Sequence, residues 1–230
     1  MSSPSMQVPG RPIVLKIGGS LATGPRLLRV LDVAAGSKRR IAIVPGGGEF
    51  ADLVRKSQAQ YRFDDRAAHR MAILGMHQTG LMFEALQPRL VAVETLSAMR
   101  GAWSRGRMPV WLPLKLTDRD RTIPASWDAT SDGLAARLAQ RLKADRVILL
   151  KSCPIDREAG VRDLVRKGIV DPVFARIVEG HAMNWCALGP GEETLLEEAL
   201  GTDEAGGDVV AAAAQGSSHR RRARGVVRPR

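Results

Sequence analysis

Residues 12–20 read PIVLKIGGS, and this stretch decides the predicted fold. Its apolar run, interrupted by Lys16, is typical of a buried strand, and the two glycines end that strand in a tight loop. Residues 41–48, IAIVPGGG, repeat the arrangement. A helical spacing of apolar residues follows each loop, at 25–35 and 49–61. The chain therefore predicts successive strand–loop–helix units.

The same alternation continues toward residue 201. Asp64-Asp65 is a start signal for a long helix to residue 86, and another helix is predicted at 131–143. Further strands are predicted at 90–93, 110–112 and 147–150. This order favours an α/β fold with a mostly parallel sheet covered by helices on both faces. Such sheets bind ligands beyond the carboxyl ends of their strands, where both glycine loops fall.

Length and composition favour one folded domain. The chain has 230 residues, of which 44% are apolar and 26% charged, and this composition argues against wholesale disorder. We predict an N-terminal tail at 1–11, a folded domain at 12–201 and a disordered basic tail at 202–230. No apolar run approaches the ~20 residues of a membrane span. The absence of a secretory signal and the presence of only two cysteines lead us to expect a reduced cytoplasmic protein with no membrane partner.

The positive charge is concentrated at the C-terminus. The formal net charge is +11, and residues 216–230 contain six arginines and no acid, so +5 remains for residues 1–215. Aromatic side chains make up 4% of the chain, which leaves few platforms for stacking single-stranded nucleic acid. We therefore predict no specific nucleic-acid partner, and we favour a solvated tail over an RNA- or membrane-binding arm.

The two glycine loops have the properties of a phosphate site. Glycine lets backbone N–H groups approach an anion, and a helix that begins after the loop favours negative charge at its N-terminus. Lys16 adds a full positive charge near the first loop. Either loop alone is more often plain turn geometry, and neither matches the Walker A or the dinucleotide-binding motif. Together with the lysine, they favour phosphate binding.

A third element is the stretch 127–136, WDATSDGLAA. Thr130 or Ser131 is the predicted helix cap, and Asp132 falls in the first turn of the helix. Acids are common in first turns because they interact favourably with the helix dipole. Two interpretations stay open from the residues alone: a purely structural aspartate, or one that holds a lysine or a metal ion beside a phosphate site.

Taken together, the K-x-G-G-S loop at 16–20, the G-G-G loop at 46–48 and Asp132 resemble the amino acid kinase family over residues 12–200. The stretches at 45–55, 68–74 and 126–132 are similar to the methanofuran-biosynthesis branch of that family. The resemblance implies a three-layer αβα sandwich around a mostly parallel central sheet. It also implies an acceptor over the N-terminal half and ATP over the C-terminal half.

The resemblance further implies roles at matching positions. Lys16 would neutralise charge on the transferred phosphoryl group, Asp132 would orient Lys16, and Lys151 would offer a second cation. The implied ATP and phosphate contacts are Gly18, Gly19, Ser20, Gly47, Gly48, Lys151 and Ser152. The implied acceptor contacts are Gly46, Gly47, Gly48, Asp128, Thr130 and Ser131. Many family members carry a late G-G-M-x-x-K stretch that residues 168–174 lack, and we expect Lys151 to compensate.

The implied activity is ATP-dependent transfer of the γ-phosphoryl group to a phosphate monoester, an aminomethylfuran-methyl phosphate of methanofuran-type cofactor biosynthesis. Mg²⁺ is expected on the ATP phosphates, without a dedicated protein metal site. Two alternatives stay open: a kinase of a carboxylate or nucleoside monophosphate, and a non-catalytic nucleotide- or anion-binding protein. A phosphate acceptor needs extra cations, for which Arg55, Arg66 and Arg70 are candidates. We expect a homo-oligomer, as is common in the family.

Two other side-chain types attract attention. His69 and His77 share one face of the predicted long helix, and helix packing or a helix-end hydrogen bond is favoured there over substrate contact. No metal spacing accompanies them. Trp127 either stacks on a flat ring of the acceptor or packs beneath its own loop.

Overall fold

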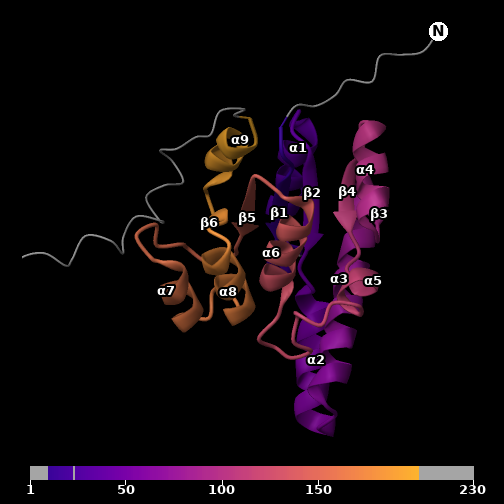
Figure 1. Cartoon of the computed structure of the whole chain (residues 1–230), viewed down its shortest axis with the longest axis vertical. Helices are drawn as coiled ribbons and strands as arrows, with labels where there is room; N and C mark the ends of the chain where they lie inside the picture. The colour runs from indigo at the N-terminus through magenta and orange to yellow at the C-terminus, as the bar shows by residue number, and fades with distance from the viewer. Residues whose placement is uncertain (1–9, 23, 202–230) are drawn as a thin grey trace, which may run out of the picture.

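The computed structural model describes residues 10–22 and 24–201, which form a single six-stranded sheet flanked by helices (Figure 1). The strand order is β3-β4-β2-β1-β5-β6, and all neighbouring strands are parallel. The strands are β1 (Ile13–Ile17), β2 (Ile41–Pro45), β3 (Leu90–Val93), β4 (Met108–Trp111), β5 (Arg146–Leu150) and β6 (Asn184–Leu188). The helices are η1 (Gly19–Leu21), α1 (Arg26–Gly36), α2 (Gly48–Tyr61), α3 (Asp65–Leu86), α4 (Leu96–Ser104), α5 (Leu114–Thr117), α6 (Ser131–Leu142), α7 (Val161–Arg166), α8 (Pro172–Gly180) and α9 (Glu193–Gly201).

The central strands are buried on both faces, as an α/β sandwich requires. Alternate residues of β1 enter opposite cores, because side chains alternate along a strand. Ile13, Leu15 and Ile17 pack with α1 and α9, whereas Val14 packs with α6 and α8. Lys16 is two residues from Val14, so its side chain lies on the same face of β1 and points toward α6. The predicted αβα sandwich is confirmed.

The site is positioned by the register of three strands. β1 pairs with β2 on one side and with β5 on the other, and Ile17 lies opposite both Pro45 and Leu150. The three strands therefore end at one level of the sheet. The strand order reverses at β1, which makes this edge a topological switch point, the usual place for a ligand in such sheets.

Most of the predicted elements are present. The strand predicted at 110–112 begins two residues earlier, at Met108. Sequence patterns did not reveal α4, α5, α7, α8, α9 or β6. β6 is an edge strand with only its last residue buried, and α7 has six residues, so neither carries a strong periodic pattern. The predicted tails lie outside the described residues, apart from Gly10 and Arg11.

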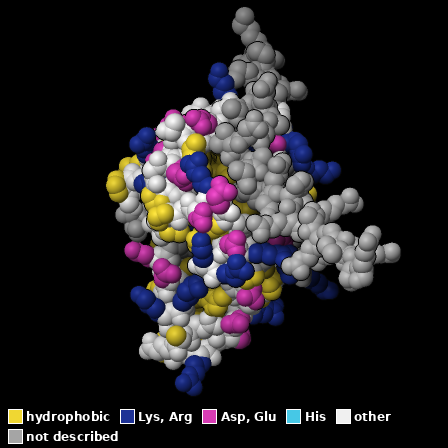
Figure 2. All heavy atoms as spheres, turned by 90° about the vertical axis from the view of Figure 1, so that its left-hand side faces the viewer, with side chains coloured by type: hydrophobic (Ala, Val, Ile, Leu, Met, Phe, Trp, Pro, Cys, Tyr) yellow, Lys and Arg dark blue, Asp and Glu magenta, His cyan; other side chains and the backbone are white. Residues whose placement is uncertain are grey.

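Charged side chains of both signs are distributed over the described surface (Figure 2). Figure 2 shows acidic and basic side chains interspersed over the face that carries α7, α8, β6 and α9. Several of them pair, as in Arg162 with Glu179 and Arg157 with Glu192. None of the helices in the described part of the chain combines the length and the hydrophobicity of a membrane span.

Candidate active site

The two glycine loops touch each other at the carboxyl edge of the sheet. A Cβ atom on Gly19 would lie closer than 3.0 Å to the backbone nitrogen of Gly48, and one on Gly46 would lie equally close to the nitrogen of Gly19. Gly48 has a φ of +53°, a conformation that L side chains rarely adopt. Only glycine fits these positions. The close approach forms a backbone cradle at the strand ends. Within it, the nitrogens of Gly18 and Gly46 donate to Leu150 O and Ile17 O, so the Gly18 nitrogen predicted to contact phosphate is already bonded to β5.

Two lysines share one buried carboxylate beside this cradle. Lys16 Nζ lies 2.8 Å from Asp132 Oδ1, and Lys151 Nζ lies 2.6 Å from Asp132 Oδ2. The three come from β1, the first turn of α6 and the residue after β5. Lys151 also donates to the carbonyl oxygen of Ile169 at 2.5 Å. All three side chains are about nine-tenths buried or more, so their charges act on each other with little solvent screening.

The shared carboxylate is ionised, and one of the lysines titrates below its normal range. Burial alone would raise the pKa of Asp132, but the charges and hydrogen bonds of Lys16 and Lys151 outweigh burial and lower it. Burial and the charge of Lys16 lower the pKa of Lys151 to about 8, against the opposing pull of Asp132. Because both carboxylate oxygens face lysines, Asp132 is an organiser of cations and a poor proton acceptor.

A second aspartate, Asp171, was not identified from the sequence, and it binds the N-terminus of α6, the helix that carries Asp132. Asp171 Oδ2 accepts hydrogen bonds from the backbone nitrogens of Thr130 and Gly133 and from Thr130 Oγ1, at 2.8–2.9 Å. Its Oδ1 caps α8 by accepting from Phe174 N at 2.7 Å. Burial, and then the charge of Asp132, raise the pKa of Asp171. The Asp171-Pro172 pair is a recognisable helix start, so sequence could have located the cap, though not its link to α6.

Hydrogen bonds connect the loops that follow β1, β5 and β6. Ser20 Oγ donates to Ser152 Oγ at 2.7 Å, which joins two of the predicted nucleotide contacts. Arg26, from α1, donates to the carbonyl oxygen of Lys151 at 2.9 Å and also bonds Gly189 O and Glu193. These bonds fix the backbone from which Lys151 projects. Arg26 carried no motif that would have singled it out.

A cavity of about 230 Å³ lies on the α2 and α3 side of the cradle. One wall is built from Gly19, Ser20, Gly47 and Gly48, and Thr130 and Ser131 lie at the start of α6. The opposite wall comes from α3 and contains His69, Ala72, Ile73 and Met76. Asp52, Arg55 and Trp127 also line the cavity, together with Ala51, Ala129 and Leu134. The cavity therefore joins backbone donors, an apolar wall and a few charged groups, as small-molecule sites do.

Arg55 is the candidate cation that reaches this cavity. Its guanidinium carbon lies 3.9 Å from the centroid of the Trp127 ring, and Trp127 Nε1 donates to Gln58 at 2.7 Å. Trp127 thus packs against the arginine, and the two hold each other in place. Arg70 pairs instead with Asp118 on the surface, and Arg66 is exposed and does not line the cavity.

Two of the predicted acceptor contacts lie elsewhere. The Asp128 side chain is exposed and makes a hydrogen bond with Ser126, and Asp128 does not line the cavity. Gly46 is buried between the two loops, where it permits their close approach. Lys167, near the missing late motif, pairs with Asp156 at the surface, 3.6 Å away. Ile169, from the same region, contacts Lys151 through its carbonyl oxygen.

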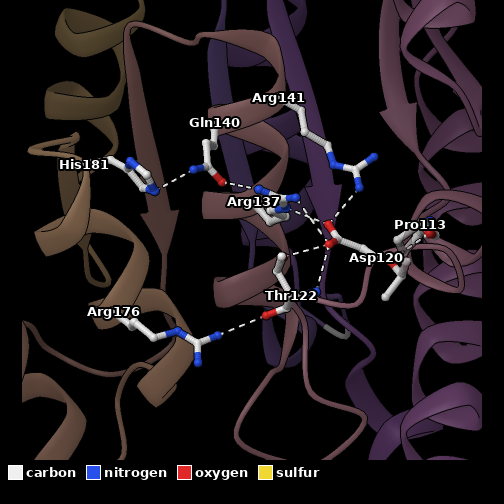
Figure 3. Close-up of polar contacts among 9 residues, drawn as sticks. Pro113, Asp120, Thr122, Arg137, Gln140, Arg141, Arg176 and His181 are labelled. Carbon is white, nitrogen blue, oxygen red and sulfur yellow. Dashed lines mark hydrogen bonds and ion pairs between the residues drawn. The ribbon is translucent and has the colours of Figure 1, made fainter.

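The segment that carries Trp127 is anchored by a buried carboxylate outside the cavity (Figure 3). Asp120 accepts hydrogen bonds from Arg137 and Arg141 of α6, at 2.6 and 2.7 Å for the shortest contact of each. It also accepts from Thr122 Oγ1 at 2.7 Å. Arg176 of α8 donates to the carbonyl oxygen of Thr122. This network attaches the loop between α5 and α6 to helices α6 and α8.

Comparisons with known proteins agree with this geometry. The family model described as "Amino acid kinase family" matches residues 11–154. The chain is 30% identical over 138 residues to the [5-(aminomethyl)furan-3-yl]methyl phosphate kinase of Methanocaldococcus jannaschii. That match covers 59% of this chain and 63% of the relative, which is less than two thirds of the relative's length.

Solved structures share the fold at low sequence identity. A UMP kinase from Ureaplasma parvum superposes with a TM-score of 0.61 at 12% identity, over 83% of this chain and 96% of that one. The uridylate kinase from Archaeoglobus fulgidus superposes with a TM-score of 0.59 at 15% identity, over 83% and 95% of the two chains. These likenesses show the fold.

Proposed function

The chain belongs to the amino acid kinase family, and from that premise we propose that it is an ATP-dependent kinase of a phosphate monoester. The acceptor we propose is an (aminomethyl)furanylmethyl phosphate, the compound named in the similar archaeal kinase, in the biosynthesis of a methanofuran-type cofactor. The observation that carries the proposal is the pair of lysines held by Asp132 beside two touching glycine loops.

The lysines supply what phosphoryl transfer requires. Such transfer needs positioning and charge stabilisation more than covalent chemistry, because charge spreads over the oxygens of the moving group. Lys16 and Lys151 hold two ammonium groups on one carboxylate, and the cradle adds backbone N–H donors. Donors that are fixed before the reaction cost no reorganisation when the charge develops. In this proposal Lys16 contacts the phosphoryl group in transit, and Lys151 lies on the nucleotide side with Ser20 and Ser152.

The acceptor side fits a phosphate monoester. The first N–H groups of α2 have no partner within the helix and face an anion favourably. Arg55 adds a full positive charge on the same cavity, and no carboxylate pairs with it among the described residues. A monoester is largely doubly ionised near neutral pH, since its second pKa is about 6. Its oxygen needs no general base, which matches the engagement of both Asp132 oxygens by lysines.

Magnesium would neutralise charge on the nucleotide phosphates, as it does in most ATP-dependent kinases. Within the described residues, 10–22 and 24–201, no group of three histidine, cysteine, aspartate or glutamate side chains could hold a metal ion. The residues present therefore do not fit a dedicated protein cage, and phosphate oxygens would hold the ion.

We also propose that the protein works in the cytoplasm as a homo-oligomer. Cys153 and Cys186 are both free thiols, which suits a reducing compartment. Met71, Leu74 and Leu81 expose apolar side chains along α3, each at least 41% accessible. Such an exposed apolar stripe supports a subunit contact.

The test is ADP release by the intact chain with ATP and Mg²⁺ against a panel of acceptors. The proposal expects turnover with the (aminomethyl)furanylmethyl phosphate and little with UMP or aspartate. Lys16→Ala should lower kcat by about 30-fold to 1,000-fold, the usual cost of a lost transition-state contact of ~2–4 kcal/mol. Lys115→Ala is the matched control, because Lys115 is half-exposed, pairs with Glu94 and does not line the cavity.

Three outcomes would contradict the proposal. Preferential turnover of UMP or aspartate would replace the acceptor class. Nucleotide binding without ADP release, for every acceptor tested, would indicate a non-catalytic binding protein. An unchanged kcat in Lys16→Ala would remove the proposed role of the paired lysines.

A further inference from the structure

His69 carries a buried polar atom that nothing in the described chain satisfies. The residue lies in α3 and is 8% exposed, and it lines the cavity beside Ala72 and Ile73. Its Nε2 atom has no hydrogen-bond partner among the residues that the structure describes. A buried polar group without a hydrogen-bond partner destabilises the folded protein. Such an atom on the wall of a ligand cavity points to a partner that the ligand supplies.

The chemistry of the missing partner follows from the other ring nitrogen. A hydrogen bond to the backbone of Ala129 raises the pKa of the ring, as expected when an imidazole N–H donates to a carbonyl oxygen. Because Nε2 has no partner, we assign this N–H to Nδ1. Burial lowers the pKa of His69, against the smaller opposing effects of that bond and of Asp118. A neutral ring that donates from Nδ1 has a lone pair at Nε2. Nε2 therefore seeks a hydrogen-bond donor.

A second histidine on the same helix shows the contrast. His77 Nε2 accepts a hydrogen bond from the backbone nitrogen of Leu114 at 3.0 Å, at the start of α5. Its acceptor atom is satisfied within the protein, and a helix-end hydrogen bond was one of the two interpretations that the sequence favoured. His69 is a histidine on the same helix, and it lines the cavity, but its Nε2 is buried and has no such partner.

The rest of the cavity limits what can carry the donor. Backbone N–H groups and Arg55 suit a phosphate at one end. Ala72, Ile73 and Met76 offer an apolar wall suited to a small flat ring. Asp52 adds a negative charge to the lining. An acceptor that satisfies all of these has a phosphate, an apolar body and a cationic hydrogen-bond donor.

We propose that His69 is an acceptor-binding residue that selects a primary amine: Nε2 accepts a hydrogen bond from the ammonium group of the phosphate-bearing acceptor. This proposal rests on the proposed function and assigns a specificity determinant within it. His69 acts on binding, through a contact remote from the phosphoryl group, so it should affect KM far more than kcat.

Two substitutions separate the ligand contact from the contact to Ala129. His69→Asn keeps an N–H donor near the position of Nδ1 but has no atom at Nε2. His69→Gln places an amide oxygen near Nε2 and can accept the hydrogen bond again. The acceptors are the (aminomethyl)furanylmethyl phosphate and its analogue with methyl in place of aminomethyl. His181→Asn is the matched control, because His181 is exposed at the end of α8 and bonds Gln140 (Figure 3).

The proposal expects His69→Asn to raise KM for the amine-bearing acceptor about 10-fold to 100-fold, the range of a hydrogen bond to a charged group. KM for the methyl analogue should change less than threefold, and His69→Gln should recover much of the loss. Circular dichroism and thermal melting establish that each variant is folded. His181→Asn should match the wild type with both acceptors.

The outcomes distinguish this proposal from the proposed function. Equal losses with both acceptors, or no loss with either, overturn the role of His69 and leave the kinase assignment standing. Absence of ADP release by the wild type with both acceptors overturns the proposed function, and the amine-binding role with it.

Discussion

At the scale of single residues, Lys151 is the group whose chemistry differs most from that of a free side chain. It is 9% exposed, and it shares Asp132 with Lys16, so two ammonium groups lie next to each other in a poorly solvated place. Burial and the charge of Lys16 lower its pKa to about 8. Lys151 therefore changes charge within a pH range in which the rate of the enzyme can be measured.

We expect kcat to fall as the pH rises through about 8, because Lys151 then loses the proton that makes it a cation. In Lys151→Arg the guanidinium stays charged at every pH up to 10, so the alkaline decline should disappear even if the rate is lower overall. The measurement is kcat at saturating substrates from pH 6.5 to 10. A wild-type profile that stays flat across this range would show that the charge of Lys151 is not required.

At this scale the sequence identified Lys16, Asp132 and Lys151 as candidates. It could not establish that the two lysines meet on one carboxylate, since that depends on which strands are neighbours. For His69 it favoured helix packing or a helix-end hydrogen bond, and the structure adds that Nε2 has no partner and that the residue lines the cavity. Satisfaction of a polar atom is a property of the surroundings, which local sequence does not report.

At the scale of elements, the shape of the backbone cradle depends on how closely the two glycine loops, after β1 and after β2, approach each other. Gly46 and Gly19 lie in mutual contact, and a methyl group on either would enter the backbone of the other loop. The loops must then separate, or their strands must shift. Both changes would widen the cradle that the backbone N–H groups form.

We expect Gly46→Ala to destabilise the protein by about 1–3 kcal/mol, as overpacking usually does, and to lower kcat at least tenfold. The matched control is Gly36→Ala at the end of α1, where a Cβ would meet nothing within 4 Å. That substitution should be neutral or slightly stabilising. Urea unfolding and ADP release measure the two effects. A Gly46→Ala variant with wild-type stability and rate would show that the contact between the loops is not needed.

Elements with strong local signals were predictable, and those whose existence depends on packing were not. The buried runs of β1, β2 and β5 and the capped start of α3 at Asp64 are visible in the sequence. β6 is half-exposed at the sheet edge and is a strand because it pairs with β5. Asp171 likewise connects α8 to α6 through contacts between segments remote in the chain.

At the scale of the whole molecule, the Asp120 network joins the loop between α5 and α6 to helices α6 and α8 (Figure 3). The Asp120 side chain is 5% exposed and accepts from Arg137 and Arg141. Burial alone would raise the pKa of Asp120, but the hydrogen bonds from Arg137, Thr122 and Arg141 outweigh burial and lower it. The network thus stabilises the fold while this carboxylate is ionised.

We expect Asp120→Asn to lower the free energy of unfolding by about 1–3 kcal/mol at pH 7, because hydrogen bonds to charged groups are lost. The lowered pKa in the folded state means that this stabilisation is present above the unfolded value of about 3.9 and is lost as the pH falls below it. The difference in the free energy of unfolding between the wild type and Asp120→Asn should therefore become smaller as the pH falls. Urea unfolding from pH 7 to pH 3 measures it.

Asp118→Asn is the matched control for that experiment. Asp118 lies two residues away, and its pair with Arg70 is solvent-exposed, so its loss should change stability by no more than about 1 kcal/mol. A constant gap between Asp120→Asn and wild type from pH 7 to pH 3 would contradict the ionic origin of the stabilisation.

The sequence by itself determined the buried strands β1, β2 and β5, the helices that follow the glycine loops, the two Cβ-free loops and the lysine at the first of them, because these are encoded by residues adjacent along the chain. Only the tertiary structure decided the strand order that puts β5 beside β1, and with it the meeting of Lys151 and Lys16 on Asp132. It also decided the burial of Asp171 and the cavity wall at His69. Contacts of this kind are set by the packing of distant segments, and packing depends on the whole fold at once.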